Sequence, residues 1–249
     1  MAVVALSSAK GAPGVSTLAV LLGATWHRRA LVVEADPSGG VLATRYGIGV
    51  EPGLMSLATA ARRGIAPHQV PEHAQPVSDQ LGLICAPVTG SQTASVLVHG
   101  GPRLGQLLAG VPDTDVFVDA GRWWPGSAAS DFCRAADVWL WVCRPRPDEV
   151  FGLMEPITRE RAHTNVGLIT VGQEPSPPRE VAALLDVLLV GTIHDEPRAA
   201  ASLSGGAGSE RALRRSMWWR SGAVLSRELA GRLPLGEVGP ARREASEWH

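Results

Sequence analysis

The chain has 249 residues, 45% hydrophobic and 19% charged, and its formal net charge of −1 at pH 7 excludes a global attraction to nucleic acid or to acidic membranes. Its three cysteines are odd in number and form no CxxC pair, which argues against a disulfide framework and a zinc site. The N-terminus shows no signal-peptide pattern and no apolar run reaches the roughly 18 residues of a membrane span, so we expect a soluble cytoplasmic protein.

Short apolar runs alternate with helical patterns along the chain. We expect strands at residues 2–6, 30–34, 81–86, 115–119, 138–143, 166–171 and 187–190. We expect helices at residues 16–27, 53–63, 105–108, 147–161 and 209–233. Apolar runs without alternation are typical of strands buried on both faces. The pattern therefore predicts an α/β fold with a doubly wound, mainly parallel sheet of about seven strands and helices on both faces. We expect one domain over residues 1–235 and a polar C-terminal tail over 236–249.

A glycine-rich segment, SSAKGAPGVST, joins the first strand to the first helix. Gly11 and Gly14 would let backbone N–H groups approach an anion, and the helix that follows points its N-terminus at the same place. The hydroxyl of Ser16 or Thr17 could hold Mg²⁺. The segment is therefore a candidate phosphate loop. The alternative is an ordinary turn between a strand and a helix.

The loop lacks one residue that phosphate loops usually have. The pattern GxxxxGK[ST] requires a lysine directly before the hydroxyl residue, and Val15 stands there. Lys10, the only lysine among the 23 lysines and arginines, lies five residues earlier inside the same loop. Its retention there suggests that the position needs a compact ammonium group.

Two later strands end in carboxylates. The strand at 30–34 ends in EADPSGG, with Glu34 and Asp36, and DVFVDAG ends on Asp119. Because ligands of parallel sheets bind beyond the carboxyl ends of the strands, these groups are expected near the loop. Glu34 and Asp36 could orient a water or lie around a metal, and Asp119 is placed like the Mg²⁺-holding aspartate of a Walker B strand. The alternative for EADPSGG is a capped turn.

Together the three segments resemble the deviant Walker A ATPases of the MinD/ParA class. The family loop reads KGGxGK[ST]T, and in AKGAPGVST the place of its signature lysine is held by Lys10. EADPSG is similar to the family motif DxDPQG. The resemblance covers nearly the whole chain at low motif fidelity. It implies a P-loop NTPase fold and ATP with Mg²⁺ as cofactors. It places nucleotide contacts at Lys10, Gly11, Ala12, Gly14, Val15, Ser16 and Thr17.

The resemblance also implies roles for individual residues. It puts Mg²⁺ on Ser16 and Asp119, and it gives Asp36 and Lys10 catalytic roles. In the family, the signature lysine reaches across a face-to-face dimer to the nucleotide of the partner subunit. Since Val15 replaces the second loop lysine, we expect a homodimer that binds ATP weakly and hydrolyses it slowly.

Three functions stay open on the sequence. The first is a MinD/ParA-like dimeric switch that partitions or positions DNA or a polar or secretion complex. The second is a pseudo-ATPase scaffold that dimerises and binds protein partners without catalysis. The third is a biosynthetic P-loop enzyme, for which the chain shows no substrate-pocket motif.

The helix expected at 209–233 carries clustered arginines and tryptophans. ParA-like proteins bind non-specific DNA through basic residues near their C-terminal helices, and the candidates here are Arg211, Arg214, Arg215 and Arg220, beside Trp218 and Trp219. Spacing of four residues would put Arg214 and Trp218 on one helical face. The alternative is a solvated arginine face. The tail is polar and short of bulky apolar residues, so we expect no membrane anchor.

A tryptophan pair directly follows the strand that ends on Asp119. Trp123 and Trp124 would form a partner or dimer surface if they are exposed, or part of the core if their loop folds inward. Trp139 and Trp141, on the strand at 138–143, are expected to be packing residues.

Overall fold

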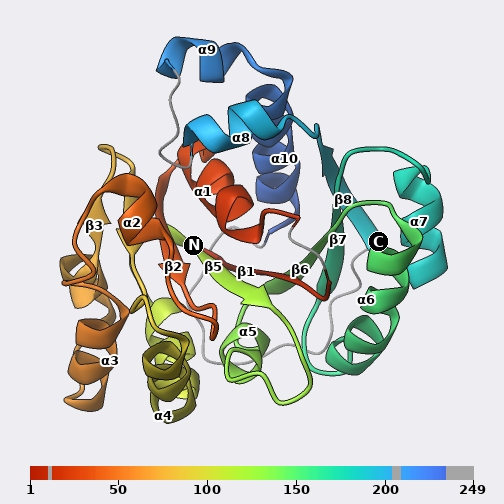
Figure 1. Ribbon diagram of the computed structural model, residues 1–249. Helices are drawn as coiled ribbons and strands as arrows, with labels where there is room; N and C mark the ends of the chain where they lie inside the picture. Colours follow the sequence, from red (N-terminus) through yellow and green to blue (C-terminus); the bar gives the residue numbers. More distant parts are fainter. Residues whose placement is uncertain (11–12, 204–208, 234–249) are drawn as a thin grey trace.

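The computed structural model describes residues 1–10, 13–203 and 209–233. Within these ranges an eight-stranded sheet carries helices on both faces, so the predicted α/β fold is confirmed (Figure 1). The strands are β1 (Val3–Ser8), β2 (Arg29–Glu34), β3 (Gln75–Pro76), β4 (Leu81–Ile84), β5 (Thr114–Arg122), β6 (Val138–Cys143), β7 (Val166–Val171) and β8 (Leu188–Ile193).

The sheet runs in the order β3-β4-β2-β5-β1-β6-β7-β8, and all neighbours are parallel except β3 and β4. The chain steps outward from β1 to β2 and β4, returns between β2 and β1 as β5, and then continues on the far side of β1. The direction of winding therefore reverses beside β1. In open α/β sheets, ligands bind at the carboxyl ends of the strands around such a reversal.

Helices cover the two faces of the sheet unequally. They are α1 (Val15–Thr25), α2 (Leu42–Tyr46), α3 (Leu54–Arg62), α4 (Gly90–Leu108), α5 (Ser130–Arg134), α6 (Pro147–Glu160), α7 (Pro178–Leu185), α8 (Pro197–Leu203), α9 (Glu210–Arg215) and α10 (Met217–Arg232), with a 3-10 turn at Pro67–His73. Figure 1 shows α1, α8 and α10 on one face and α3 to α7 on the other. In the described part of the chain, none of these helices has the length and apolarity that a membrane crossing requires.

Each strand supplies side chains to both cores, because successive residues of a strand point to opposite faces. In β1, Val3 and Ala5 pack with the core under α3 to α7, whereas Val4 and Leu6 pack with the core under α1 and α10. All six residues of β1 are buried. The strand is therefore fixed from both sides, and the loop that follows it starts from a rigid position.

Three tryptophans pack against one another in the core on the α6 side of the sheet. The rings of Trp139 and Trp141 are stacked with their centroids 5.0 Å apart, and Trp123 meets Trp141 edge-on at 6.0 Å. Trp139 also donates its indole N–H to the Ser7 hydroxyl over 3.0 Å. Of the pair predicted either to be exposed or to be buried, Trp123 is in the core at 6% exposure and Trp124 is 39% exposed.

The sequence pattern missed β3 and most of α4. β3 has only two residues, so no apolar run marks it. The residues expected to be helical, 105–108, are only the last turn of α4, which begins at Gly90 because packing overrides the glycines and the proline that interrupt its pattern. Its large apolar side chains that join the core also covered by α3 are Val96, Leu97, Leu104, Leu107 and Leu108.

The single helix predicted at 209–233 is two helices, and that prediction was wrong. Ser216 is extended, with φ −64° and ψ 152°, and its hydroxyl accepts the N–H of Trp219 to start α10. The expected Arg214–Trp218 face is therefore absent. Trp218 is 4% exposed, whereas the Arg214 guanidinium lies over the Trp219 ring, 5.2 Å from its centroid.

Candidate functional site

The glycine-rich loop connects the buried end of β1 to the first turn of α1. Gly14, with φ +88°, occupies a left-handed conformation that favours glycine, and its carbonyl accepts the N–H of Leu18 over 2.8 Å. The N–H groups of the first turn of α1 point out of this end of the helix and favour negative charge there. Gly11 and Ala12, two of the predicted nucleotide contacts, lie outside the described residues.

Asp119 is the central carboxylate of the site. It lies on β5 in register with Leu6 of β1 and Glu34 of β2, and it is completely buried. Its Oδ1 accepts the N–H of Gly121 over 3.1 Å, and the Ser16 hydroxyl of α1 interacts with the carboxylate. Its buried Oδ2 has no hydrogen-bond partner among the described residues. A buried acceptor left in this way needs a compensating donor or cation.

Burial and neighbouring charge disfavour the ionised form of Asp119. The pKa of Asp119 is raised to about 7, first by desolvation and then by the charges of Glu34 and Asp36, while hydrogen bonds from Ser16 and Gly121 lower it. The site thus collects more negative charge than the protein neutralises locally. A divalent cation would relieve both the repulsion and the unpaired oxygen.

Asp36 lies against the end of β5. A Cβ at Gly121, which has φ +61°, would meet Asp36 Cγ at 2.1 Å, so only glycine leaves room for this carboxylate. One Asp36 oxygen accepts the N–H of Ser38 over 2.8 Å. Burial raises the pKa of Asp36 above its usual value. The structure therefore brings the predicted catalytic and metal-binding aspartates, Asp36 and Asp119, together.

Glu34 has a structural task. Its Oε1 accepts the N–H groups of Val41 and Leu42, over 2.6 and 3.0 Å, and its Oε2 accepts that of Ala86 over 3.0 Å. Burial is the largest influence on its pKa, which is raised. Both oxygens are thus committed to the backbone of the turn after β2 and of the segment after β4. Glu34 holds the turn that carries Asp36.

Val15 and Lys10 occupy contrasting surroundings. Val15 is 6% exposed and packs in the core under α1, so no charge enters the loop at this position. Lys10 is exposed, and its stem lies beside α6, where a Cβ at Gly152 would be 3.4 Å from Lys10 Cβ. Arg122 donates from Nε to the carbonyl of Ala9 over 3.1 Å and so holds the start of the loop.

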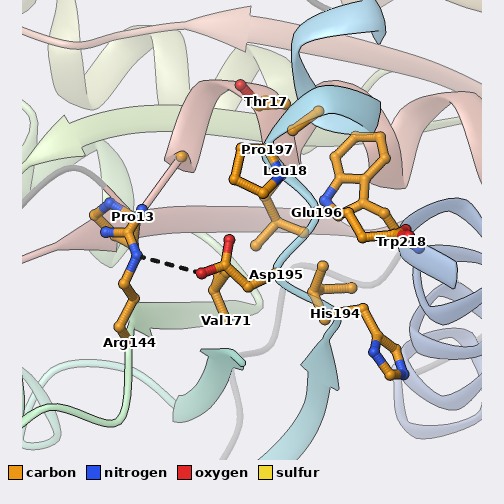
Figure 2. A pocket seen from close by; sticks show the side chains of 13 residues that line it. Pro13, Thr17, Leu18, Arg144, Val171, His194, Asp195, Glu196, Pro197 and Trp218 are labelled. Atoms are coloured by element: carbon orange, nitrogen blue, oxygen red, sulfur yellow. Dashed lines mark hydrogen bonds and ion pairs between the residues drawn. The ribbon is translucent and has the colours of Figure 1, made fainter. Parts of the chain in front are cut away.

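A cavity of about 230 Å³ opens beside the loop, at the carboxyl ends of β7 and β8 (Figure 2). The residues that line it are Pro13, Gly14, Thr17, Leu18, Arg144, Val171, Ile193, His194, Asp195, Glu196, Pro197, Ala200 and Trp218. A second hollow of about 610 Å³ shares Asp195, Glu196 and Pro197 with it.

The sequence predicted no functional role for His194–Pro197, which line one wall of this cavity. The strand expected at 187–190 extends as β8 to Ile193, and His194–Pro197 follow it directly, so an extended strand end would have revealed them. Arg144 was also missed, although it directly follows the strand correctly expected at 138–143. Its position after a strand next to β1 is the signal that could have indicated it.

The residues present fit a magnesium ion bound together with a phosphate group. Ser16 and Asp119 offer a hydroxyl and an unpaired carboxylate oxygen, both oxygen ligands of the kind that Mg²⁺ prefers. In the described residues, no cluster of three or more His, Cys, Asp or Glu side chains is arranged to hold a metal by itself. Phosphate oxygens and waters would have to supply the remaining ligands, as is usual for Mg²⁺.

Comparisons with known proteins show the fold. No protein-family model matches the chain, and no curated protein matches it. Among solved structures, it is similar to MinD of Pyrococcus horikoshii complexed with Mg-ADP, at 18% identity and TM-score 0.69, over 92% of this chain and 95% of that one. A ParA family ATPase of Chlorobium tepidum matches at 17% identity and TM-score 0.71, over 92% and 98%. An ATP complex of a Cyanothece McdA variant matches at 17% identity and TM-score 0.66, over 95% and 99%. At these identities the likeness establishes the MinD/ParA-type fold.

The raised pKa of Asp119 gives a testable pH dependence. Because its value in the folded protein, about 7, exceeds the 3.8 of an ordinary aspartate, ionisation disfavours the folded state. The wild type should lose stability from this group as the pH rises from about 4 to about 7, and Asp119→Asn should not. In urea unfolding of metal-free protein, the stability of Asp119→Asn relative to wild type should increase with pH by up to about 1.4 kcal/mol per unit and level off above pH 7. A difference that is the same at pH 5 and pH 8 would contradict this assignment.

Proposed function

We propose that the chain is a nucleotide-dependent switch of the MinD/ParA type, which binds ATP with Mg²⁺ and acts as a homodimer. The observation that carries the proposal is the buried Oδ2 of Asp119, which has no hydrogen-bond partner among the described residues and lies in a carboxylate that also interacts with Ser16 at the start of α1. This pair is suited to an ion that accompanies a phosphate group, and the N-terminus of α1 is suited to the phosphate itself. The fold shared with a Mg-ADP complex of MinD and an ATP complex of McdA supports the same ligand.

The chain's own residues would divide the work as follows. Gly14 and the backbone of Val15, Ser16 and Thr17 would cradle the phosphates, together with Gly11 and Ala12, and Lys10 would add charge. Bound Mg²⁺ would neutralise part of the phosphate charge. Asp36, whose pKa is raised above its usual value by burial, would orient the attacking water as a general base.

Weak binding follows from the position of Val15. A hydrogen bond to a charged group is worth about 1.5–3 kcal/mol, so the missing lysine would lower nucleotide affinity about ten- to a hundredfold. Lys10 is exposed beside α6 and cannot occupy the position of Val15. We propose that it serves the nucleotide of the partner subunit, which makes affinity depend on dimerisation.

Titration with labelled ATP and Mg²⁺ at several protein concentrations tests the trans contact. The apparent affinity should rise with protein concentration, because each nucleotide needs Lys10 from a second copy. Lys10→Ala should remove this dependence and lower affinity about ten- to a hundredfold, whereas Lys10→Arg should keep part of both. Wild-type affinity that is equal at every protein concentration would refute the trans lysine.

A scaffold that dimerises without catalysis is the second candidate. It is favoured by the burial of Val15 in the core under α1, since this loop position is built for packing. Such a protein would keep the fold and its partner surfaces while its site no longer turned over ATP.

Substitution of Val15 separates the two functions. If the remaining machinery is intact, Val15→Lys should raise ATP turnover by about tenfold or more over wild type, because a fixed cation would meet the charge that develops on the phosphates. Val15→Met, an uncharged replacement, is the matched control, and thermal melting reports on folding. Turnover of a folded Val15→Lys that stays at the level of Val15→Met would leave the scaffold as the function.

The cargo of the switch is proposed to be DNA or a polar or secretion complex. The DNA contacts are the four exposed arginines Arg211, Arg214, Arg215 and Arg220, of which Arg214 also pairs with Glu210 over 2.8 Å. A complex of MinD with MinC among the similar structures supports a protein partner as well. We place the protein in the cytoplasm, where both kinds of cargo occur.

Salt dependence of binding to random-sequence duplex DNA tests the basic surface. Replacing two of its arginines, Arg211 and Arg215, by alanine should reduce the slope of log affinity against log salt by about 2, because each released phosphate contact contributes about 0.9. The double variant of Arg62 and Arg63, exposed on and after α3, is the control and should keep the slope. Equal slopes in both double variants would exclude α9 as a DNA contact.

A further inference from the structure

The cavity beside the loop is lined by a cationic side chain from the segment that follows β6, the strand next to β1. β1 and β6 are paired in parallel, with Ser7 opposite Trp141, so the segments that leave these strands emerge side by side. Arg144 directly follows β6, and it lines the same cavity as Pro13, Gly14 and Thr17 (Figure 2). Its charge therefore faces the loop from within the same subunit.

Two carboxylates hold Arg144 in this position. Glu149, in the first turn of α6 and 4% exposed, accepts the backbone N–H of Arg144 over 2.7 Å and lies 3.5 Å from its guanidinium. Asp195, after β8, lies 4.0 Å from Arg144 Nε, and Figure 2 shows this contact across the cavity. The Arg144 side chain keeps 26% of its surface exposed, so these contacts do not bury it completely.

The other charges of the cavity make this arginine necessary for an anionic ligand. Asp195 and Glu196 both line the wall, and Glu196 also accepts the N–H of Trp218 over 2.5 Å. Among the described lining residues, Arg144 is the only lysine or arginine. Without it, two carboxylates would oppose a phosphate group at the cavity wall, with no other lysine or arginine among the described lining residues to offset them.

We propose that Arg144 binds the phosphates of the nucleotide in cis and supplies the positive charge that Val15 does not. The inference rests on the proposed nucleotide binding and adds a ligand from the same subunit to it. A guanidinium presents a planar pair of N–H donors that matches two phosphate oxygens, which an ammonium does not. To bind a phosphate, Arg144 would leave its 4.0 Å contact with Asp195, while Glu149 would keep accepting the backbone N–H of Arg144.

The experiment compares ATP, ADP and adenosine as ligands of wild type, Arg144→Ala and Arg146→Ala at one low protein concentration. Arg144→Ala should bind ATP about ten- to a hundredfold more weakly and adenosine with unchanged affinity, because only phosphate contacts are removed. Arg146 is exposed and lies two residues further along the same segment, so Arg146→Ala should match wild type. Arg144→Lys, which keeps the charge on a different geometry, should fall between wild type and Arg144→Ala.

A second substitution tests whether the two positions share one task. Val15→Lys should restore ATP affinity to Arg144→Ala, and it should raise the affinity of that variant more than that of wild type. Equal ATP affinity in wild type and Arg144→Ala would overturn the role of Arg144 and leave nucleotide binding intact. An equal loss for adenosine and ATP would also overturn it, because it would indicate a structural effect. A wild type that binds none of the three ligands would overturn this inference together with the proposed function.

Discussion

The burial of one carboxylate, Asp119, governs the organisation of the site. Three parallel strands end around it, and two further carboxylates, Glu34 and Asp36, raise its pKa from nearby. Such an arrangement costs free energy unless a cation or a donor compensates it. The fold accommodates part of the charge by committing Glu34 to backbone donors, whereas one oxygen of Asp119 has no hydrogen-bond partner among the described residues. The site therefore has the carboxylates expected of a metal and phosphate site, whereas the lysine usually found in the loop is replaced by Val15.

In this chain, the positive charge near the loop does not come from the position of Val15, where other phosphate loops have a lysine. Val15 is part of the core, so the candidate cations are Lys10 within the loop and Arg144, which directly follows β6. Lys10 is exposed on the surface, where it could reach a second copy of the chain, whereas Arg144 lines the cavity of its own subunit. In the proposed switch, the contact within one subunit and the contact from the second copy would therefore depend on different side chains.

The sequence predicted the sheet well and the cavity poorly, for a physical reason. Apolar runs mark strands buried on both faces, so β1, β2, β5, β6 and β7 could be located, together with the loop and the aspartates at their ends. Helix α4 and the break at Ser216 depend on tertiary packing and on a local cap, which periodicity does not record. Arg144 and Asp195 become neighbours only through the order of the strands, and that order is not written in any single segment.

The hydrogen bonds that the Glu34 carboxylate accepts from the backbone connect the site to helix α3. The same segment after β4 that donates from Ala86 to Glu34 accepts, at the carbonyl of Cys85, the N–H of Leu54 at the start of α3. The turn that carries Asp36 and the helix α3 are thus attached to one stretch of two residues. A displacement of the turn would strain the hydrogen bonds that connect it to α3, so a change at the site that moves Asp36 would also shift this helix on the outside of the sheet.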